Sequence, residues 1–156
     1  MNASVKELRE KGKILLAEKK YDEAMEVYWK WIELDDQAVH PRDVLGFLYY
    51  ITGSFEEARE QCLAALTLRP GHYYALKGLG LCLVRLGQVE EGIETIKKSI
   101  KANPGYFDSR YDLAVTYLEL ERYDEAREAF LQAGEIDSSR KIDIDKALAY
   151  LEQKQQ

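Results

Sequence analysis

The side chains that most often carry catalysis or hold metals are scarce in this sequence. Its histidines are His40 and His72, and its cysteines are Cys62 and Cys82. A structural zinc site needs about four such ligands at close, characteristic spacings, and a catalytic nucleophile needs a base and an orienting group beside it. Neither pattern occurs around these residues. We therefore predict no catalytic site, no cofactor and no bound metal, and we expect both thiols to be packing residues.

Two short motifs resemble ligand-binding loops but lack residues that those loops need. Gly78 and Gly80 have the spacing that begins a phosphate-binding loop, but the third glycine is missing and the segment lies inside a predicted helix. Asp143 and Asp145 lack the glycine and the terminal glutamate of a calcium loop. The glycines are better explained as small residues at a helix crossing.

The composition excludes several classes of protein. The 156 residues include 22 Lys and Arg against 28 Asp and Glu, a formal net charge of −6. Nucleic-acid binding depends on Lys and Arg, so an acidic chain is poorly suited to it. The first residues lack the apolar run of a secretion signal, and no stretch has the roughly 18 apolar residues of a membrane span. With only two cysteines, which is typical of a reducing compartment, we expect a cytoplasmic protein.

The helices that would position a site are predicted from an internal repeat. A bulky residue, two acidic residues and a small residue recur in that order every 34 residues. Apolar residues at helical spacing precede each such segment, and a turn separates the two, so each unit should contain two helices. The acidic residues would stabilise the start of the second helix. The segments are Tyr21-Asp-Glu-Ala24, Phe55-Glu-Glu-Ala58, Val89-Glu-Glu-Gly92 and Tyr123-Asp-Glu-Ala126.

Further columns share the period and identify the type of repeat. Small residues recur at Gly12, Gly46, Gly80 and Ala114. With Tyr49, Ala58, Ala65 and Pro70 in the second unit, the pattern resembles the tetratricopeptide repeat (TPR) family. The resemblance implies an all-α fold, a right-handed superhelical solenoid of four helix pairs whose first helices line a concave face. The repeats are placed at residues 5–38, 39–72, 73–106 and 107–140.

Two local contacts are predicted inside this frame. Ser54 and Glu57 have the spacing of a capping box at the start of a second helix. Trp31 stands where the family usually has alanine, and Arg42 stands where it usually has a large apolar residue. We expect these two side chains to stack on each other between the first and second repeats.

Residues 141–156 are predicted to form a C-terminal capping helix. Ile144, Ala147, Leu148 and Leu151 fall at the positions that pack the first helix of every other unit. Solenoids need such end caps for solubility. The alternative, a tail that folds back into the groove, fits the apolar face less well.

The resemblance places the binding surface on one stripe of the first helices. Here the stripe begins basic, continues aromatic and aliphatic, and ends acidic, and its apolar residues are not needed to pack the stack. We expect a partner segment with apolar anchors, acidic near the first repeat and basic near the fourth. The predicted binding residues are Lys6, Arg9, Lys13, Phe47, Tyr50, Tyr74, Lys77, Leu81, Asp108, Tyr111, Val115 and Glu119.

The predicted function is a non-catalytic protein-interaction scaffold. The TPR subclass that grips the C-terminal carboxylate of Hsp70 and Hsp90 needs Lys, Asn and Arg at fixed positions, and these are absent here. The corresponding residues are Arg9, Lys13, Val44, Tyr74 and Gly78. Two alternatives remain open: a small secretion chaperone like those of type III secretion, and a scaffold that self-associates.

Overall fold

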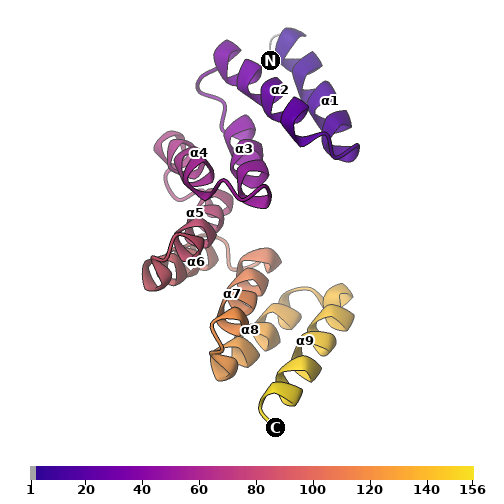
Figure 1. Ribbon diagram of the computed structural model, residues 1–156, viewed down its shortest axis with the longest axis vertical. Coiled ribbons are helices and arrows are strands. Elements are labelled where there is room, and N and C mark those ends of the chain that lie inside the picture. The colour runs from indigo at the N-terminus through magenta and orange to yellow at the C-terminus, as the bar shows by residue number, and fades with distance from the viewer. Residues whose placement is uncertain (1–2) are drawn as a thin grey trace.

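The computed structural model describes residues 3–156, and every regular element in that range is a helix (Figure 1). The helices follow one another in antiparallel pairs along an arc, from the N-terminal end to the C-terminal end. The elements are α1 (Ala3–Ala17), α2 (Tyr21–Leu34), α3 (His40–Ile51), α4 (Phe55–Leu68), α5 (Tyr73–Arg85), α6 (Val89–Ala102), α7 (Phe107–Glu119), α8 (Tyr123–Ile136), the 3₁₀ helix η1 (Ser138–Arg140) and α9 (Lys141–Lys154).

The turn inside each helix pair repeats the same backbone geometry. In the second pair, Gly53 has φ of 84°, its N–H donates to the carbonyl of Tyr50, and the Ser54 N–H donates to that of Tyr49 at 2.8 Å. This is a Schellman motif, which ends a helix with one residue in the left-handed region. Ser54 makes no side-chain capping bond, so the capping box predicted there is wrong. The left-handed residues of the four turns inside the pairs are Lys19, Gly53, Gly87 and Glu121.

Lys19 and Glu121 occupy left-handed positions that suit glycine, at φ of 57° and 59°. A side chain there costs about 1 kcal/mol. We therefore expect Lys19→Gly and Glu121→Gly each to raise the free energy of unfolding by up to about 1 kcal/mol, reduced by the greater freedom of glycine in the unfolded chain. Urea denaturation followed by circular dichroism measures the change. Gly53→Ala is the reciprocal control and should destabilise; a stabilising Gly53→Ala would contradict the assignment.

A close helix approach lies within the third pair, where α5 crosses α6. A Cβ atom added at Gly80 would lie 2.7 Å from the carbonyl oxygen of Gly92, and one at Gly92 would lie 2.6 Å from that of Gly80. Gly12 has a related role, since a Cβ there would lie 2.7 Å from the ring of Tyr28, a side chain of α2. The small-residue column predicted from the repeat therefore lies where paired helices meet.

The buried apolar side chains are spread along the array. One cluster joins α1, α2 and α3 around Tyr28, Trp31 and Leu45, and another joins α6 to α9 around Ile96 and Phe130. Each repeat thus buries its apolar face mainly against its neighbours, as expected for a solenoid.

At the first repeat junction, Trp31 packs against His40, with ring centroids 5.4 Å apart, and stacks on Tyr28 at 6.2 Å. Arg42 turns the other way and donates from Nη2 to the backbone carbonyl of Asp36 at 3.0 Å. The predicted Trp31–Arg42 stack is therefore wrong, because the start of α3 supplies a ring as the partner and the Asp36 carbonyl holds the guanidinium.

The last helix, α9, packs against α8. Ile144 and Leu151 are buried there, and Ala147 and Leu148 pack against the same cluster. The opposite face of α9 leaves Ile142 68% exposed. This arrangement covers the end of the fourth pair.

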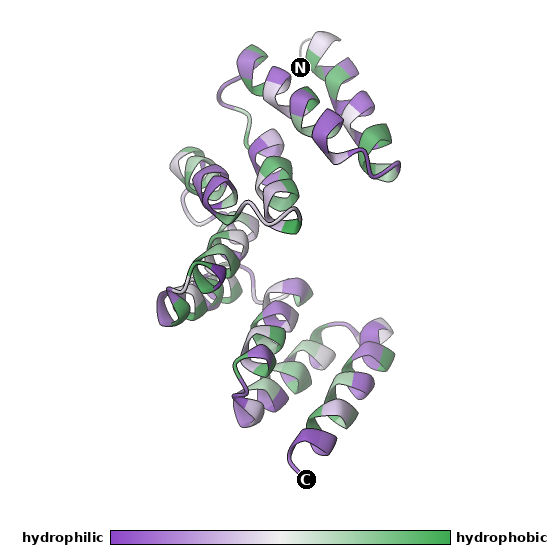
Figure 2. Ribbon diagram, in the orientation of Figure 1, coloured by the Kyte–Doolittle hydropathy of each residue, from purple (hydrophilic) through white to green (hydrophobic). Residues whose placement is uncertain are grey.

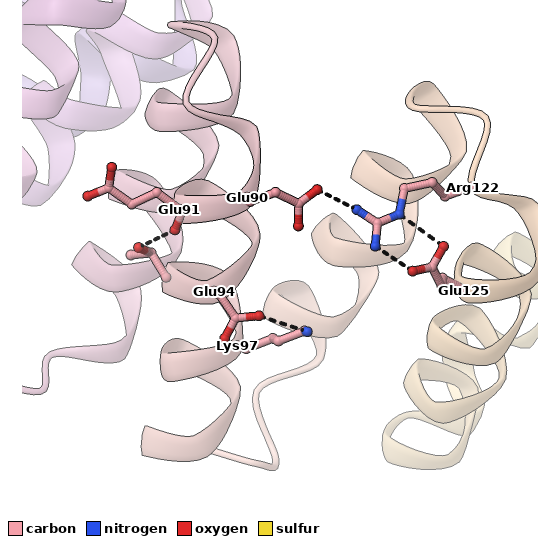
Figure 3. Close-up of polar contacts among 7 residues, drawn as sticks. Glu90, Glu91, Glu94, Lys97, Arg122 and Glu125 are labelled. Atoms are coloured by element: carbon pink, nitrogen blue, oxygen red, sulfur yellow. Dashed lines mark hydrogen bonds and ion pairs between the residues drawn. The ribbon is translucent and has the colours of Figure 1, made fainter.

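Ion pairs tie the third and fourth pairs together on the surface (Figure 3). Arg122, in the turn before α8, donates to Glu90 of α6 at 2.8 Å and also binds Glu125 of α8. Its guanidinium lies 4.9 Å from the centroid of the Tyr117 ring. Pairs this exposed contribute modestly to stability, so their main effect is to orient the turn.

The helices carry both polar and apolar residues along their lengths (Figure 2). Within residues 3–156, none of them combines the length and the apolar character that crossing a bilayer requires. Many of their apolar residues instead pack helices against each other in the buried clusters.

Candidate functional site

A groove runs across the first helices of the second, third and fourth pairs. It encloses about 320 Å³. Because α3 packs against α5 and α5 against α7, side chains from three repeats meet on one surface. We call this surface the central groove; its residues are Phe47, Tyr50, Ile51, Lys77, Leu81, Val84, Arg85, Asp108, Asp112, Val115, Thr116 and Glu119.

A small cavity of about 50 Å³ adjoins the groove between α3 and α5. Two glycines beside it pack closely on Cys62 of α4: a Cβ added at Gly78 would lie 2.9 Å from the Sγ atom of Cys62, and one at Gly46 would lie 3.3 Å from it. Its walls are mostly apolar or aromatic. We call it the Gly46–Gly78 cavity; its residues are Asp43, Gly46, Phe47, Tyr50, Cys62, Tyr74, Ala75, Lys77, Gly78 and Leu81.

Both cations of the central groove are held by carboxylates of α7. Lys77 Nζ lies 3.2 Å from Asp112 Oδ2, and Arg85 Nη2 lies 3.2 Å from Glu119 Oε1. Arg85 Nε also donates to the hydroxyl of Tyr50 at 3.1 Å, so one guanidinium links α3, α5 and α7. Burial raises the pKa of Asp112 above its ordinary value, although Lys77 opposes the shift.

Asp43, on the wall of the cavity, is only partly satisfied. Its Oδ2 atom lies 2.8 Å from Nε2 of His72, and the two side chains are 16% and 10% exposed. Its other oxygen, Oδ1, is buried and has no hydrogen-bond partner. Burial raises the pKa of this carboxyl despite the lowering effect of His72. An acceptor in this state gains from a ligand that brings a donor.

Aromatic rings surround the ammonium group of Lys77. Its Nζ atom lies 5.2 Å from the Tyr74 ring centroid and 5.6 Å from that of Tyr106. Burial and the neighbouring carboxylates raise the pKa of Tyr74 to about 12, so it remains a neutral hydrogen-bonding phenol at physiological pH. Rings and carboxylate together fix Lys77 in place.

The surface continues from α7 onto α9. A second hollow of about 440 Å³ shares Val115 and Glu119 with the central groove and adds Leu118, Tyr150 and Lys154. Lys154 Nζ lies 5.4 Å from the Tyr150 ring centroid. The accessible stripe therefore extends from the second pair to the last helix.

Most of the predicted binding residues come together on this surface. Tyr74 lines the cavity. Those in the central groove are Phe47, Tyr50, Lys77, Leu81, Asp108, Val115 and Glu119.

The basic residues of α1 do not line the central groove. Lys6 and Lys13 are exposed, and Lys13 pairs with Glu10 at 3.0 Å, while Arg9 is half-buried with its Nε atom unpartnered. The first junction is made by α2 against α3, and α1 makes no contact with α3 comparable to that between α3 and α5. The predicted basic entrance therefore lies beyond the continuous groove.

Tyr111 also lies outside the groove. Its ring stacks on Phe107 at 5.4 Å and meets the edge of Phe130 at 5.5 Å, and Arg140 of η1 lies 5.8 Å from its centroid. Tyr111 thus packs into the fourth repeat, where η1 and α9 replace the start of a further full repeat.

The predicted binding residues omit Asp43 and Arg85, although both lie on the same stripe of the first helices. The stripe itself missed Asp112 and the α9 residues Tyr150 and Lys154. Asp112 lies one position after Tyr111, outside the predicted stripe, but faces Lys77 of the preceding repeat. The opposite charge at that repeat step could have indicated it. Treating α9 as a first helix, rather than only as an end cap, would have pointed to the other two.

The potential ligands for metals do not gather in one place. In the part of the chain that the structure describes, no group of His, Cys, Asp or Glu side chains is arranged to hold a metal ion. Cys62 and Cys82 are buried and unbridged. Hydrogen bonding to Cys82 and burial both raise the pKa of the Cys62 thiol, which opposes formation of the reactive thiolate.

These features define a helical-repeat solenoid with a side-chain-lined groove. Family models match two overlapping segments, "Tetratricopeptide repeat" at residues 43–72 and "Anaphase-promoting complex, cyclosome, subunit 3" at residues 60–133. Over these matched residues the chain carries tetratricopeptide repeats. The prediction of an all-α TPR solenoid is thereby confirmed.

Individual relatives are similar over part of the chain or in fold. A peroxisomal targeting signal receptor of Eremothecium gossypii is 33% identical over 89 residues, which are 57% of this chain and 16% of the receptor. The chain thus spans less than a fifth of that relative. TTC0263 of Thermus thermophilus has a TM-score of 0.84 at 20% identity, covering 97% and 82% of the two chains. The first TPR domain of Spaghetti (RPAP3), solved with an HSP90 peptide, has a TM-score of 0.68 at 23% identity, covering 76% and 94%.

Proposed function

We propose that this TPR protein is a non-catalytic scaffold that binds a segment of a partner protein in the central groove. The observation that carries the proposal is the exposure of apolar side chains at the groove, where Phe47 is 48% and Ile51 is 42% exposed. Neither belongs to the buried core clusters. Large apolar side chains gathered beside a cavity favour a binding surface.

The groove offers an anchoring point as well as an apolar rim. The Gly46–Gly78 cavity adjoins Phe47 and Leu81, so an apolar side chain of a partner would find both a recess and rings around it. Buried anchor residues supply most of the affinity at protein interfaces. The partner segment is a short helix or an extended peptide, since both modes present side chains at the spacing of a helical groove.

The relatives support the proposal by analogy. A solved TPR domain of the same fold holds an HSP90 peptide, and the receptor similar over part of the chain is named for a targeting signal. The Hsp90-type carboxylate clamp is not proposed here, because Tyr74 and Gly78 occupy two of its positions and line the apolar cavity. Unbridged Cys62 and Cys82 favour a reducing compartment such as the cytoplasm.

Selection from a displayed random peptide library tests the proposal. The immobilised wild-type protein should enrich peptides rich in apolar residues. The Val115→Arg variant should enrich none of them, because Val115 lies in both hollows and an arginine there would obstruct them. Leu131→Arg, at a 51% exposed position of α8, is the matched control and should behave like wild type. Failure to enrich any peptide, or equal enrichment on Val115→Arg, would overturn the proposal.

A further inference from the structure

We infer that the partner segment is basic: it carries a Lys or Arg beside the apolar side chain that enters the Gly46–Gly78 cavity, and that cation binds Asp43. The inference rests on the proposed function and names the chemistry of the ligand. It follows from the charges that line the two hollows and from the unsatisfied state of one carboxylate.

The central groove and its cavity are acidic on balance. Their charged side chains are four carboxylates and two cations. The cations are already engaged, Lys77 with Asp112 and Arg85 with Glu119. The remaining carboxylates, Asp43 and Asp108, form no ion pair with Lys or Arg in the described chain. A ligand that enters the groove therefore meets two carboxylates, one on α3 and one on α7, that form no ion pair with Lys or Arg.

Asp43 is the carboxylate best placed to bind a cation of the ligand. It lines the same cavity as Gly46, Gly78 and Leu81, so an apolar anchor in the cavity would bring its neighbouring residue close to Asp43. One oxygen already interacts with His72, and Oδ1 has no donor. A guanidinium or ammonium group at the mouth would bind this carboxylate, whose side chain is 16% exposed, in a charge-assisted bond, which is stronger than a neutral one.

Asp108 offers a second, weaker point of attraction across α5. Burial raises the pKa of the neighbouring Tyr106 phenol, and the negative charge of Asp108 adds to that shift. No Lys or Arg forms an ion pair with Asp108 in the described chain. An acidic ligand in the same groove would face both Asp43 and Asp108. Such a ligand could form an ion pair with Lys77 or Arg85 only by displacing the carboxylate that the cation already binds. The charges therefore favour a basic partner over an acidic one.

A double-mutant cycle on one selected peptide tests this inference. The peptide is fluorescently labelled and made in two forms, one with Arg beside the apolar anchor and one with citrulline, its uncharged isostere. Wild type should bind the citrulline form about tenfold more weakly, the scale of one charge-assisted bond. Asp43→Asn should bind the Arg form about tenfold more weakly than wild type and should distinguish the two forms by less than about twofold.

The matched control is Asp145→Asn, the same change at an exposed position of α9, which should keep the full discrimination. Circular dichroism checks that Asp43→Asn is folded; if it is not, Asp108→Asn takes its place and should reduce the preference for the Arg form. Equal binding of both forms by wild type, or undiminished discrimination in Asp43→Asn, would overturn the inference. Enriched apolar peptides without basic residues would also overturn it while leaving the proposed function standing, whereas no enrichment at all would overturn the function itself.

Discussion

Replacing Gly92 by alanine is expected to lower the free energy of unfolding by about 3 kcal/mol, at the upper end of overpacking effects. A Cβ atom there would lie 2.6 Å from the carbonyl oxygen of Gly80 and 2.9 Å from the backbone nitrogen of Val84. Neither is the free end of a side chain, so α5 and α6 would have to move apart. The α5–α6 pair lies in the middle of the array (Figure 1), and its separation would weaken contacts to both neighbours.

Urea denaturation monitored by circular dichroism measures this loss. Gly134→Ala is the control, since Gly134 is also helical but a Cβ there would meet Ile144 only at 3.4 Å or more. Alanine favours helix over glycine, so this control should be neutral or stabilised by up to about 1 kcal/mol. If Gly92→Ala were as stable as Gly134→Ala, the close α5–α6 crossing would be wrong.

The second large effect concerns binding. Replacing Phe47 and Ile51 together by serine should lower the affinity for a selected peptide by about a hundredfold, the scale of removing an interface hot spot. Both side chains are more than two-fifths exposed, so the fold should lose little. Tyr50 is left intact because it accepts a hydrogen bond from Arg85 and packs on Phe55 at 5.4 Å.

Fluorescence polarisation with the labelled peptide gives the two affinities. The matched control changes Leu63 and Leu131 to serine, since these are 46% and 51% exposed on α4 and α8, helices that do not line the central groove. The control should bind as wild type does. Equal weakening in both double variants would mean that general apolar exposure, and not the groove, holds the peptide.

The repeat architecture could be predicted because the same sequence pattern recurs in each of the four repeats. The second helices begin at Tyr21, Phe55, Val89 and Tyr123, the residues that open the recurring segments. Any single position is weak evidence for the repeat, but a pattern of this length is strong evidence. Short turns then pair helices that are neighbours in sequence. Local details depend on fewer residues, and there the predictions failed: Ser54 does not cap α4, since a Schellman turn already fixes the backbone.

The groove could be predicted only in part. The apolar positions Phe47, Leu81 and Val115 follow from the repeat step, which determines the outward stripe of each first helix. The boundaries do not follow from it, because they depend on how closely first helices approach one another. The wide first junction leaves Lys6, Arg9 and Lys13 outside, and α9 extends the surface at the other end. Side-chain pairings between repeats, such as Arg85 with Tyr50, require the superhelical geometry itself.

The most direct test of the central claim is to map a selected peptide on isotope-labelled protein by NMR. Binding in the central groove should produce its largest changes in amide chemical shift on α3, α5 and α7, around Gly46, Gly78 and Val115. Amides of α4, α6 and α8 away from the cavity should change little. Changes concentrated on those second helices, or on the exposed face of α9 around Ile142, would contradict binding in the central groove.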